Sequence, residues 1–386
     1  MTLAKSKLGD YLLPVRNISL GNLTTDMDIT YVDISSVHRE QREIIRHQII
    51  PANEAPSRAR QEIAKDDVIV STVRPNLNTV ALVTGKYAGA IASTGFCVLR
   101  AMPEKLDARF LFHWISSEAT VNRLIGLATG ATYPAVSDKI IKSLPFAAPP
   151  ISVQQRIATI LDKAGSLFRK RQEAIRLVDE FLKAVFYERF GDPVTNPKGF
   201  PTNRVDQLCE VATGSTPARN RADYYAGPHP WIKTGEVDAP LIVSAEEHIS
   251  DEAIRETNCK VFPIGTLLIA MYGQGKTRGK VGMLGISAAT NQACAAILPS
   301  QKIDQQFLYT QLTLMYEHLR AMGRGGNQEN LNLGMIKALK VQVPPDHLVD
   351  EFLKVRSKVL EITSKALCAQ KDSEAMVKSL VAKFFA

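Results

Sequence analysis

Apolar residues recur at every seventh position in two long stretches of the sequence, and each stretch follows a Pro-Pro pair. In each stretch the apolar residues spaced by seven form a first row, and a second row lies three positions further along the chain. Only Arg171 and Ser373 interrupt the first rows. Rows sustained over several heptads predict two helices of about 35 residues that pair in a coiled coil. The rows are Ile157, Ala164, Val178, Val185 with Ile160, Leu167, Ala174, Phe181 in the first stretch, and Phe352, Val359, Ala366, Leu380 with Val355, Ile362, Ala369, Met376 in the second.

Outside these helices the sequence alternates short β-rich runs with Gly, Asn and Pro. A typical run is Asp-Val-Ile-Val-Ser-Thr-Val at 67–73, which is rich in the β-branched residues that strands favour. One helix is expected in each of these regions, near 109–124 and 305–322. We therefore predict two compact α+β domains of about 150 residues each.

The chain also repeats itself at a nearly constant separation. Short matching stretches lie 195, 197 and 199 residues apart, and changes in loop length explain the small drift. Because the matches are collinear, chance similarity of short apolar runs is a poor explanation. The matched pairs are 144–150 with 339–345, 110–112 with 307–309, and 68–71 with 267–270.

The repeat and the two helices divide the chain into four parts. A first globular domain is expected at 1–148, and a central helix at 149–192 ends at a Gly-Asp-Pro sequence. A second globular domain at 193–343 and a C-terminal helix at 344–386 follow. The predicted order is therefore globule, long helix, globule, long helix.

Composition supports a globular chain of more than one domain. The 386 residues are 45% hydrophobic and 22% charged, which excludes global disorder and a collagen-like or mucin-like chain. No run of about 18 apolar residues is present and the first residues lack a signal-peptide core, so we expect no membrane association and a cytoplasmic chain. The five cysteines are scattered singly, which argues against a disulfide framework and a zinc site.

The sequence predicts no catalytic, cofactor-binding or metal site. The segment 270–277 fits a relaxed phosphate-loop pattern, but that motif needs a helix directly after its Lys-Thr, and the following residues predict a turn and another strand. The histidines lack metal-ligand spacing, and no metal-nuclease carboxylate pattern follows the one Pro-Asp pair. An enzyme that binds nucleotide with the loop 273–277 is therefore a weaker alternative.

A moderate positive charge, +8 from 47 basic and 39 acidic residues, makes DNA a candidate ligand. In the first domain the densest candidate loop follows a strand and carries a cation and amides. Arg pairs bidentately with guanine and Asn with adenine, so this loop is suited to base edges, and two cations upstream are suited to phosphates. The candidate contacts are Ser71, Thr72, Arg74, Asn76 and Asn78, together with Arg58 and Arg60.

The equivalent loop of the second domain, 272–280, carries three cations, a Gln and several glycines. Glycines allow the backbone to approach a polyanion closely. A solvated polar loop is the alternative for each residue, but basic and amide side chains recur at the same strand end in both repeats. The candidate contacts are Tyr272, Gln274, Lys276, Thr277, Arg278 and Lys280, with the amides Asn327 and Gln328 on a further loop.

A set of stretches spread over the whole chain carries a family resemblance. They are the Pro-Pro and Gln-Gln-Arg-Ile residues within 149–157, the helix end at 186–193, the segments 55–61 and 71–77, and 330–337 before the second Pro-Pro. Together they resemble the specificity subunit of a Type I restriction-modification enzyme. One departure is that the second helix begins Asp-His-Leu-Val-Asp at 346–350, where the first has Ile-Ser-Val-Gln-Gln at 151–155. This difference leaves open whether both helices bind partners equally.

The resemblance implies an α+β fold in which two DNA target-recognition domains are separated by two long helices that form an antiparallel coiled coil. It implies a non-catalytic subunit whose partners are double-stranded DNA, two S-adenosylmethionine-dependent DNA methyltransferase (modification) subunits and restriction/translocase subunits. Each globule is expected to read one half of a bipartite, asymmetric target, while the coiled coil sets the spacer and docks the methyltransferases. The alternative from another class is a free-standing bipartite DNA-binding protein without enzymatic partners.

Overall fold

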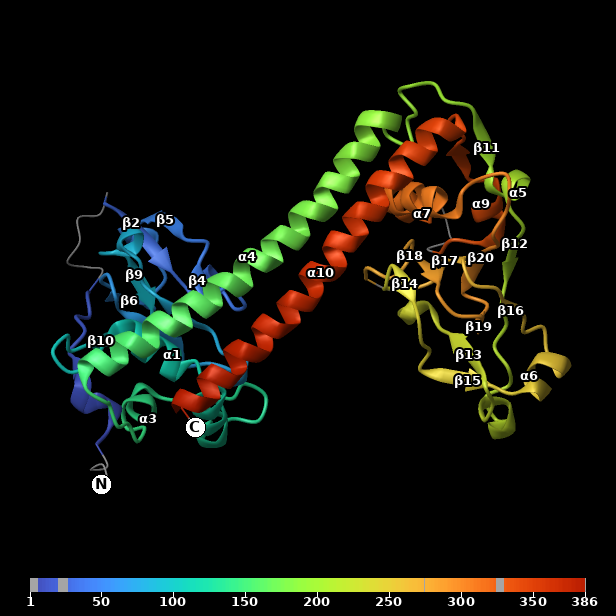
Figure 1. Cartoon of the computed structure of the whole chain (residues 1–386). Helices are drawn as coiled ribbons and strands as arrows, with labels where there is room; N and C mark the ends of the chain where they lie inside the picture. Colours follow the sequence, from blue (N-terminus) through green and yellow to red (C-terminus); the bar gives the residue numbers. More distant parts are fainter. Residues whose placement is uncertain (1–5, 20–26, 274, 324–329, 386) are drawn as a thin grey trace. The chain divides into compact units, whose positions relative to one another are not determined.

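The chain divides into two compact units (Figure 1). Unit 1 comprises Met1–Ile175 and Lys365–Ala386, and unit 2 comprises Arg176–Ser364. Each unit therefore contains one globular region and a part of each long helix. The computed structural model describes residues 6–19, 27–273, 275–323 and 330–385.

Unit 1 is built on two four-stranded sheets and a small hairpin. In spatial order, the strands of the first sheet are β1 (Leu12–Leu13), β10 (Phe96–Ala101), β7 (Val68–Ser71) and β8 (Val80–Leu82). Those of the second sheet are β5 (Gln48–Pro51), β2 (Asp28–Val32), β9 (Ile91–Ser93) and β6 (Ala59–Glu62). The hairpin is formed by β3 (Val37–His38) and β4 (Glu43–Ile44). Neighbouring strands are antiparallel except for β2 and β9, which are parallel.

Unit 2 repeats the strand order of both four-stranded sheets. The strands of its first sheet are β12 (Val211–Thr213), β20 (Cys294–Ile297), β17 (Leu267–Ala270), β18 (Val281–Leu284) and the additional β14 (Leu241–Ile242). Those of its second sheet are β15 (Glu247–Ile249), β13 (His229–Ile232), β19 (Ala288–Thr290) and β16 (Val261–Phe262). In addition, β11 (Thr202–Arg204) pairs with β21 (Lys340–Gln342). The parallel pair of the second sheet recurs as β13 with β19. The internal repeat predicted from the sequence is thus confirmed as a repeat of topology.

The strands at the centre of each first sheet are apolar throughout because both of their faces are covered. Val68 and Val70 of β7 join one hydrophobic cluster, while Ile69 between them joins another. In β17, Leu267 and Ile269 alternate in the same way with their neighbours. Successive side chains of a strand point to opposite faces, so covering both faces selects a continuous apolar run. These runs were among the collinear sequence matches.

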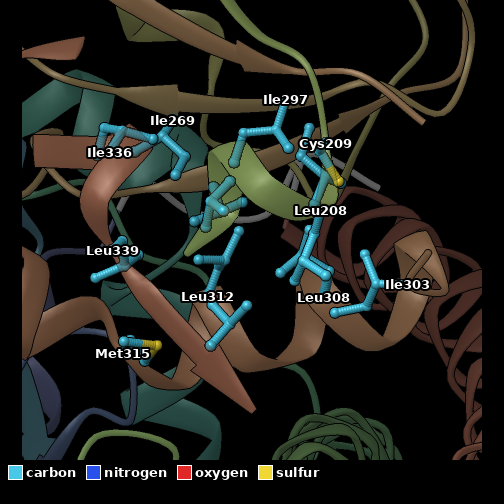
Figure 2. Close-up of a cluster of buried hydrophobic side chains, with 14 of the residues drawn as sticks. Leu208, Cys209, Ile269, Ile297, Ile303, Leu308, Leu312, Met315, Ile336 and Leu339 are labelled. Atoms are coloured by element: carbon cyan, nitrogen blue, oxygen red, sulfur yellow. The ribbon is translucent and has the colours of Figure 1, made fainter. Parts of the chain in front are cut away.

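The core on one face of the first sheet of unit 2 is closed by short helices. Figure 2 shows Leu308 and Leu312 of α7 (Gln305–Leu314) facing Ile269 and Ile297 of the sheet, with all four side chains buried. Burying a side chain of this size contributes roughly 2 kcal/mol relative to leaving it exposed. The helix is therefore fixed on the sheet by packing.

Each globular region has two consecutive helices where one was predicted. The break in unit 1 falls at Ser116 and Ser117: the Ser116 hydroxyl donates to the Phe112 carbonyl, and the Ser117 hydroxyl caps the next helix by accepting from the Thr120 amide. Serine competes with the helix in this way by bonding to the backbone. The helices are α1 (Ala108–Ile115), α2 (Glu118–Leu127) and α3 (Asp138–Lys142) in unit 1, and α5 (Val205–Leu208), α6 (Asp251–Glu256), α7, α8 (Tyr316–Met322) and α9 (Leu333–Ala338) in unit 2.

The long helices are α4 (Ile151–Phe190) and α10 (Asp346–Phe385), and they contact each other within both units. In unit 1 the Arg171 guanidinium donates to the Ala369 carbonyl and to the Ser373 hydroxyl, so the two residues that interrupt the apolar rows bond to each other. In unit 2 the ring centroids of Phe186 and Phe352 lie 5.5 Å apart. Across the described ranges, every helix is too short or too polar to cross a bilayer.

The first apolar row of each long helix faces inward as predicted. In the second row the prediction was wrong at five of eight positions, which are exposed, while Ile160, Val355 and Ala369 are half-buried. Leu167 and Phe181 of α4 are 40% and 54% exposed, and Ile362 and Met376 of α10 are 54% and 42% exposed. In α4 the positions one residue later are buried or half-buried instead, and they are Leu161, Phe168, Ile175 and Leu182. Positions three and four residues after a row both lie close to it on a helix, and both are apolar in α4, so the pattern alone cannot choose between them.

Candidate nucleic-acid interface

The candidate loop of unit 1 has a fixed backbone. It contains the short 3-10 helix η5 (Pro75–Leu77), and the residues on either side, Arg74 and Asn78, have φ of 50° and 46°. Such left-handed backbone is uncommon for residues other than glycine and needs support from its surroundings. The support at Arg74 is a 2.7 Å hydrogen bond from its amide to the Pro134 carbonyl. The loop therefore presents the exposed side chains of Arg74 and Asn76 from a defined position.

Three of the predicted contacts in this loop use their polar groups inside unit 1. The Ser71 hydroxyl, which is buried, donates to the Val73 carbonyl at 2.9 Å, and the Thr72 hydroxyl donates to the Gly95 carbonyl at 2.9 Å. The Asn78 side-chain amide donates to the Ser116 carbonyl at the end of α1, at 2.9 Å. We leave these three residues out of the proposed contact surface, because an engaged group must lose its partner before it can meet DNA.

The two upstream arginines lie beside this loop. Arg58 and Arg60 are both exposed, and Arg60 lies on β6. The Arg58 carbonyl accepts from the Thr94 amide at 2.8 Å. The carbonyl of Gly95, the residue after Thr94, accepts from the Thr72 amide at 2.9 Å. The turn between β9 and β10 thus connects the two segments. The backbone that carries Arg58 is therefore linked through this turn to the start of the loop that carries Arg74 and Asn76.

The corresponding loop of unit 2 is held by α8. The Tyr316 hydroxyl donates to the Lys276 carbonyl at 2.7 Å, and Arg320 donates to the Gly275 carbonyl at 2.7 Å. Gly273, Gly275 and Gly279 have positive φ, so the loop follows a path that other residues rarely adopt. Lys276 and Tyr272 are exposed at its tip.

The remaining candidates in unit 2 are less accessible. Lys280 forms an ion pair with Asp238, and Thr277 and Arg278 are half-buried. The Arg278 Nε atom is buried and has no hydrogen-bond partner among the described residues. Three further candidates, Gln274, Asn327 and Gln328, lie outside the described residues.

The phosphate-loop alternative fails on local structure. Thr277 is followed by a turn and then by β18, as predicted, and not by a helix. A phosphate site of that kind depends on the amides at a helix N-terminus. Across residues 6–19, 27–273, 275–323 and 330–385, no cluster of three His, Cys, Asp or Glu side chains could hold a metal ion.

Charge is unevenly distributed within unit 2. The loop 272–280 carries three basic residues and no acidic one, whereas 223–256, which includes β13, β14, β15 and α6, carries eight acidic and two basic residues. A polyanion is attracted to the first region and repelled by the second. The charge pattern therefore favours the strand-end loop as the side of unit 2 that meets DNA.

Sequence reasoning missed the residues that hold the loops. Tyr133 in unit 1, and Tyr316 with Arg320 in unit 2, all contact a candidate loop. Each lies about 40 to 60 residues downstream of the loop that it contacts. The one available signal was that these tyrosines precede the last matching segment of each repeat, 144–150 and 339–345, which locates them in the repeat without linking them to the loop.

The buried glutamine at the start of α4 has a structural role. The Gln154 side chain accepts from the Asp107 amide at 2.9 Å and donates to the Lys105 and Pro149 carbonyls at 2.9 and 2.8 Å. It is fully buried, so it is unavailable to a partner. The equivalent position in α10 is Val349. At this position the sequence difference between the two helices therefore affects packing inside the chain.

The sequence matches a known family over most of its length. The model of the family described as Type I restriction modification DNA specificity domain matches residues 22–176 and 197–351. The chain therefore belongs to the Type I restriction-modification DNA specificity family and carries two copies of its domain.

Two curated proteins illustrate the relationship. The chain is similar to the Type I restriction enzyme HindI specificity subunit of Haemophilus influenzae, with 20% identity over 396 residues that cover 83% of this chain and 85% of the relative. It is also similar to the EcoR124I/EcoR124II specificity subunit of Escherichia coli, with 22% identity over 245 residues that cover 59% of this chain and 58% of the relative.

Solved structures share the fold. A chain from a structure of complex assembly and conformational transition in the type I R-M system has a TM-score of 0.61 and 22% identity, covering 100% of this chain and 99% of that chain. The S subunit of a Type I restriction-modification system from M. genitalium also has a TM-score of 0.61, with 13% identity, covering 100% of this chain and 96% of that chain. These likenesses show a common arrangement of helices and strands.

Proposed function

We propose that this chain recognises a bipartite, asymmetric DNA sequence on behalf of a Type I restriction-modification complex, and that each unit reads one half-site. The observation that carries the proposal is the repeated strand-end loop. After β7 in unit 1 and after β17 in unit 2, a loop with a fixed backbone presents exposed basic side chains. The exposed side chains of the two loops differ, so the half-sites are expected to differ as well.

Direct contacts to bases are assigned to Arg74 and Asn76 in unit 1. Both side chains are exposed, and Arg74 forms no ion pair with any described residue. Arginine and asparagine each offer a bidentate match to one base, guanine and adenine respectively. Arg58 and Arg60 are assigned to phosphates, which fix the register of a protein on the duplex without reading sequence. Lys276 has the corresponding role in unit 2.

The outward apolar rows of the long helices support docking of two methyltransferase subunits. Leu167 and Met376 are exposed in unit 1, and Phe181 and Ile362 are exposed in unit 2. Large apolar side chains at a regular helical spacing form the kind of face that a partner helix covers. Because each unit has such side chains on both helices, two similar docking faces are expected. The S-adenosylmethionine-dependent methylation and the restriction and translocation steps belong to the partner subunits.

The pairing of α4 with α10 supports an antiparallel coiled coil that sets the unread spacer. In unit 1, Phe385 packs in the same cluster as Ile157, and further along α4 the Arg171 side chain bonds to Ser373. Residue numbers rise along one helix as they fall along the other, which is the antiparallel relation. A rigid helix pair is suited to act as a ruler because its length is fixed at 1.5 Å per residue.

The two-reader proposal is tested by methylation, in the assembled complex, of a DNA library randomised at both half-sites. We expect Arg74→Ala and Asn76→Ala to lose about 1–3 kcal/mol of discrimination at base pairs of one half-site only. Gln274→Ala should act on the other half-site. Lys276→Ala should weaken binding to all sequences and reduce its salt dependence, since a phosphate contact carries no sequence information. Lys260→Ala is the matched control, because Lys260 is an exposed lysine of the same unit outside the loop.

Several outcomes would contradict the proposal. If Asn76→Ala and Gln274→Ala degrade the same base pairs, the units do not read separate half-sites. If the chain purified from its own cells binds a bipartite site but brings no methyltransferase with it, the free-standing DNA-binding protein is the better description.

The spacer is tested by lengthening both helices. Seven residues inserted into each of α4 and α10 keep the apolar phase and lengthen the pair by about 10 Å, which is about three base-pair steps. The half-sites should stay the same while the spacer between them grows. A changed half-site with an unchanged spacer would exclude the ruler.

A further inference from the structure

A second loop of unit 1 is built onto the candidate DNA loop. Segment 129–135 closes on itself, since the Thr129 and Ala135 amides each donate to the other residue's carbonyl, at 3.0 and 2.9 Å. Gly130 has φ of 99°, and a Cβ atom there would lie 2.9 Å from the Tyr133 carbonyl oxygen, so this tight closure requires glycine. The segment is therefore a compact loop of defined shape, with Tyr133 near its tip.

The two loops are joined by backbone hydrogen bonds at Thr72 and Arg74. The Arg74 amide donates to the Pro134 carbonyl at 2.7 Å, and the Val136 amide donates to the Thr72 carbonyl at 2.8 Å. These two bonds make Val73 and Ala135 an isolated antiparallel β-bridge. Because the connections are made by the backbone, the position of Tyr133 relative to Arg74 is set independently of side-chain conformation.

The side chains of Arg74 and Tyr133 meet above this junction. The Arg74 guanidinium carbon lies 4.8 Å from the centroid of the Tyr133 ring, within the distance of a cation–π contact. Tyr133 is 66% exposed, which is the largest exposure among the large apolar side chains of the described residues. Within the described part of the chain, the Arg74 side chain has no carboxylate partner, and the Tyr133 hydroxyl forms no hydrogen bond.

We infer that Tyr133 is a specificity-determining residue that positions the Arg74 guanidinium for bidentate contact with one base pair of the DNA target. The inference rests on the proposed function, in which Arg74 reads a base. A guanidinium presents its donors in a planar fork, so a ring that limits its orientation limits which base edges it can match. Holding the side chain before DNA arrives also reduces the conformational freedom that is lost on binding.

In the described part of unit 2, the tyrosine that contacts the loop has a different role. There the Tyr316 hydroxyl binds the Lys276 carbonyl, and its ring contacts Arg320, whose guanidinium also binds the loop backbone at Gly275. That tyrosine supports the loop backbone and, among the described residues, contacts no candidate base-reading side chain. Tyr133 instead contacts a candidate base-reading side chain directly and is exposed on the same surface.

The test compares variants of Tyr133 and Arg74 in the assembled complex on the library randomised at both half-sites. Tyr133→Phe keeps the ring and should keep the native preferences. Tyr133→Leu and Tyr133→Ala remove the ring, and discrimination should fall about two- to fivefold, the range of an exposed cation–π contact. The loss should fall on the base pair that Arg74→Ala affects, and the double variant should lose no more than Arg74→Ala alone. Arg74→Lys, which keeps charge but loses the fork, should relax the same base pair without changing the salt dependence.

The possible failures are distinguishable. If Arg74→Ala relaxes a base pair and Tyr133→Ala relaxes none or a different one, the inference is overturned and the proposed function remains. If neither variant changes any preference while the complex still methylates a bipartite site, the inference and the choice of loop both fail, but the class of function stands. If the wild-type complex methylates without sequence preference, the proposed function fails and the inference fails with it. Thermal melting of each variant shows whether a loss follows from unfolding.

Discussion

Units 1 and 2 share one strand order and one loop position, but different side chains contact that loop. In unit 1 the loop after β7 is joined to a second loop through backbone hydrogen bonds, and Tyr133 stacks on Arg74. Unit 2 repeats one of these bonds, from the Leu331 amide to the Met271 carbonyl at 3.1 Å, and two side chains from α8 bind loop carbonyls as well. The apolar pattern that defines the sheets is thus compatible with several ways of supporting the loop. Recognition can change between repeats while the topology stays the same.

The starts of the two long helices differ in a similar way. Gln154 in α4 corresponds to Val349 in α10, and Leu161 corresponds to Arg356. Each repeat therefore buries a polar side chain where the other buries an apolar one. These paired positions allow the comparison to be tested by exchanging residues between repeats.

The largest effect is expected from replacing Gln154 with the residue of the other repeat. Gln154→Val removes three hydrogen bonds and leaves the Asp107 amide and two carbonyls without their partner. We expect the free energy of unfolding of unit 1 to fall by about 3 kcal/mol or more, since each unsatisfied buried group costs about 1–3 kcal/mol. Urea unfolding followed with a probe in unit 1 measures the loss. Gln155→Val, at the exposed neighbouring position, is the control and should change little; equal effects would show that Gln154 is not a structural residue.

A loss of stability of intermediate size is expected for a charge in the inward row of α4 in unit 2, and a much smaller loss for a charge in the outward row. Val178→Asp places a charge at a half-buried inward position and should cost unit 2 about 2 kcal/mol of stability. Phe181→Asp, three residues away at a position that is 54% exposed, should cost less than about 0.5 kcal/mol. Co-purification with the methyltransferase subunit should show a clear loss for Phe181→Asp, although that variant remains folded. If Phe181→Asp unfolds unit 2 instead, the second row faces inward after all.

A change in the free energy of unfolding smaller than that of Val178→Asp is expected for a substitution at Arg356, and this change should stabilise unit 2 where the preceding ones destabilise. Arg356 is 7% exposed, and its side chain donates to the Gln306 amide oxygen at 2.7 Å and lies over the Tyr309 ring. Burial lowers the pKa of this guanidinium, which reflects the unfavourable removal of a charge from water. Arg356→Leu, the residue of the other repeat, should stabilise unit 2 by about 1 kcal/mol. A loss of stability in thermal unfolding would show that the contacts of Arg356 outweigh its desolvation.

Structural features that follow from a regular period in the sequence could be predicted. Features that depend on contacts between residues far apart in the sequence could not. The α+β class, the repeat and the two long helices follow from apolar runs and heptads, which are local. The inward direction of the first rows, which include Ala164 and Val359, was also correct. The second rows were placed one position too early because α4 is apolar at both positions, and only contact with α10 decides which one is buried.

The candidate site shows the same limit. The strand-end loops could be located because each repeat has basic and amide residues there. The partners of Thr72 and Asn78 could not be predicted, because Gly95 and Ser116 lie more than 20 residues away in sequence. Tyr133 was missed for the same reason, since its relation to Arg74 exists only after the two loops have met. The assignment of these loops to DNA contact stays a prediction.

The division of the chain into units has a consequence for the order in which the protein is made. Unit 2 is one continuous segment, Arg176–Ser364, whereas unit 1 also needs the segment that begins at Lys365. The ring of Phe385 lies 5.3 Å from that of Phe110 and closes the core of unit 1. At a synthesis rate of about 5–20 residues per second, that core stays open for seconds after the last residue of unit 2 has been added. The part of the protein that is made first is therefore the last to be completed.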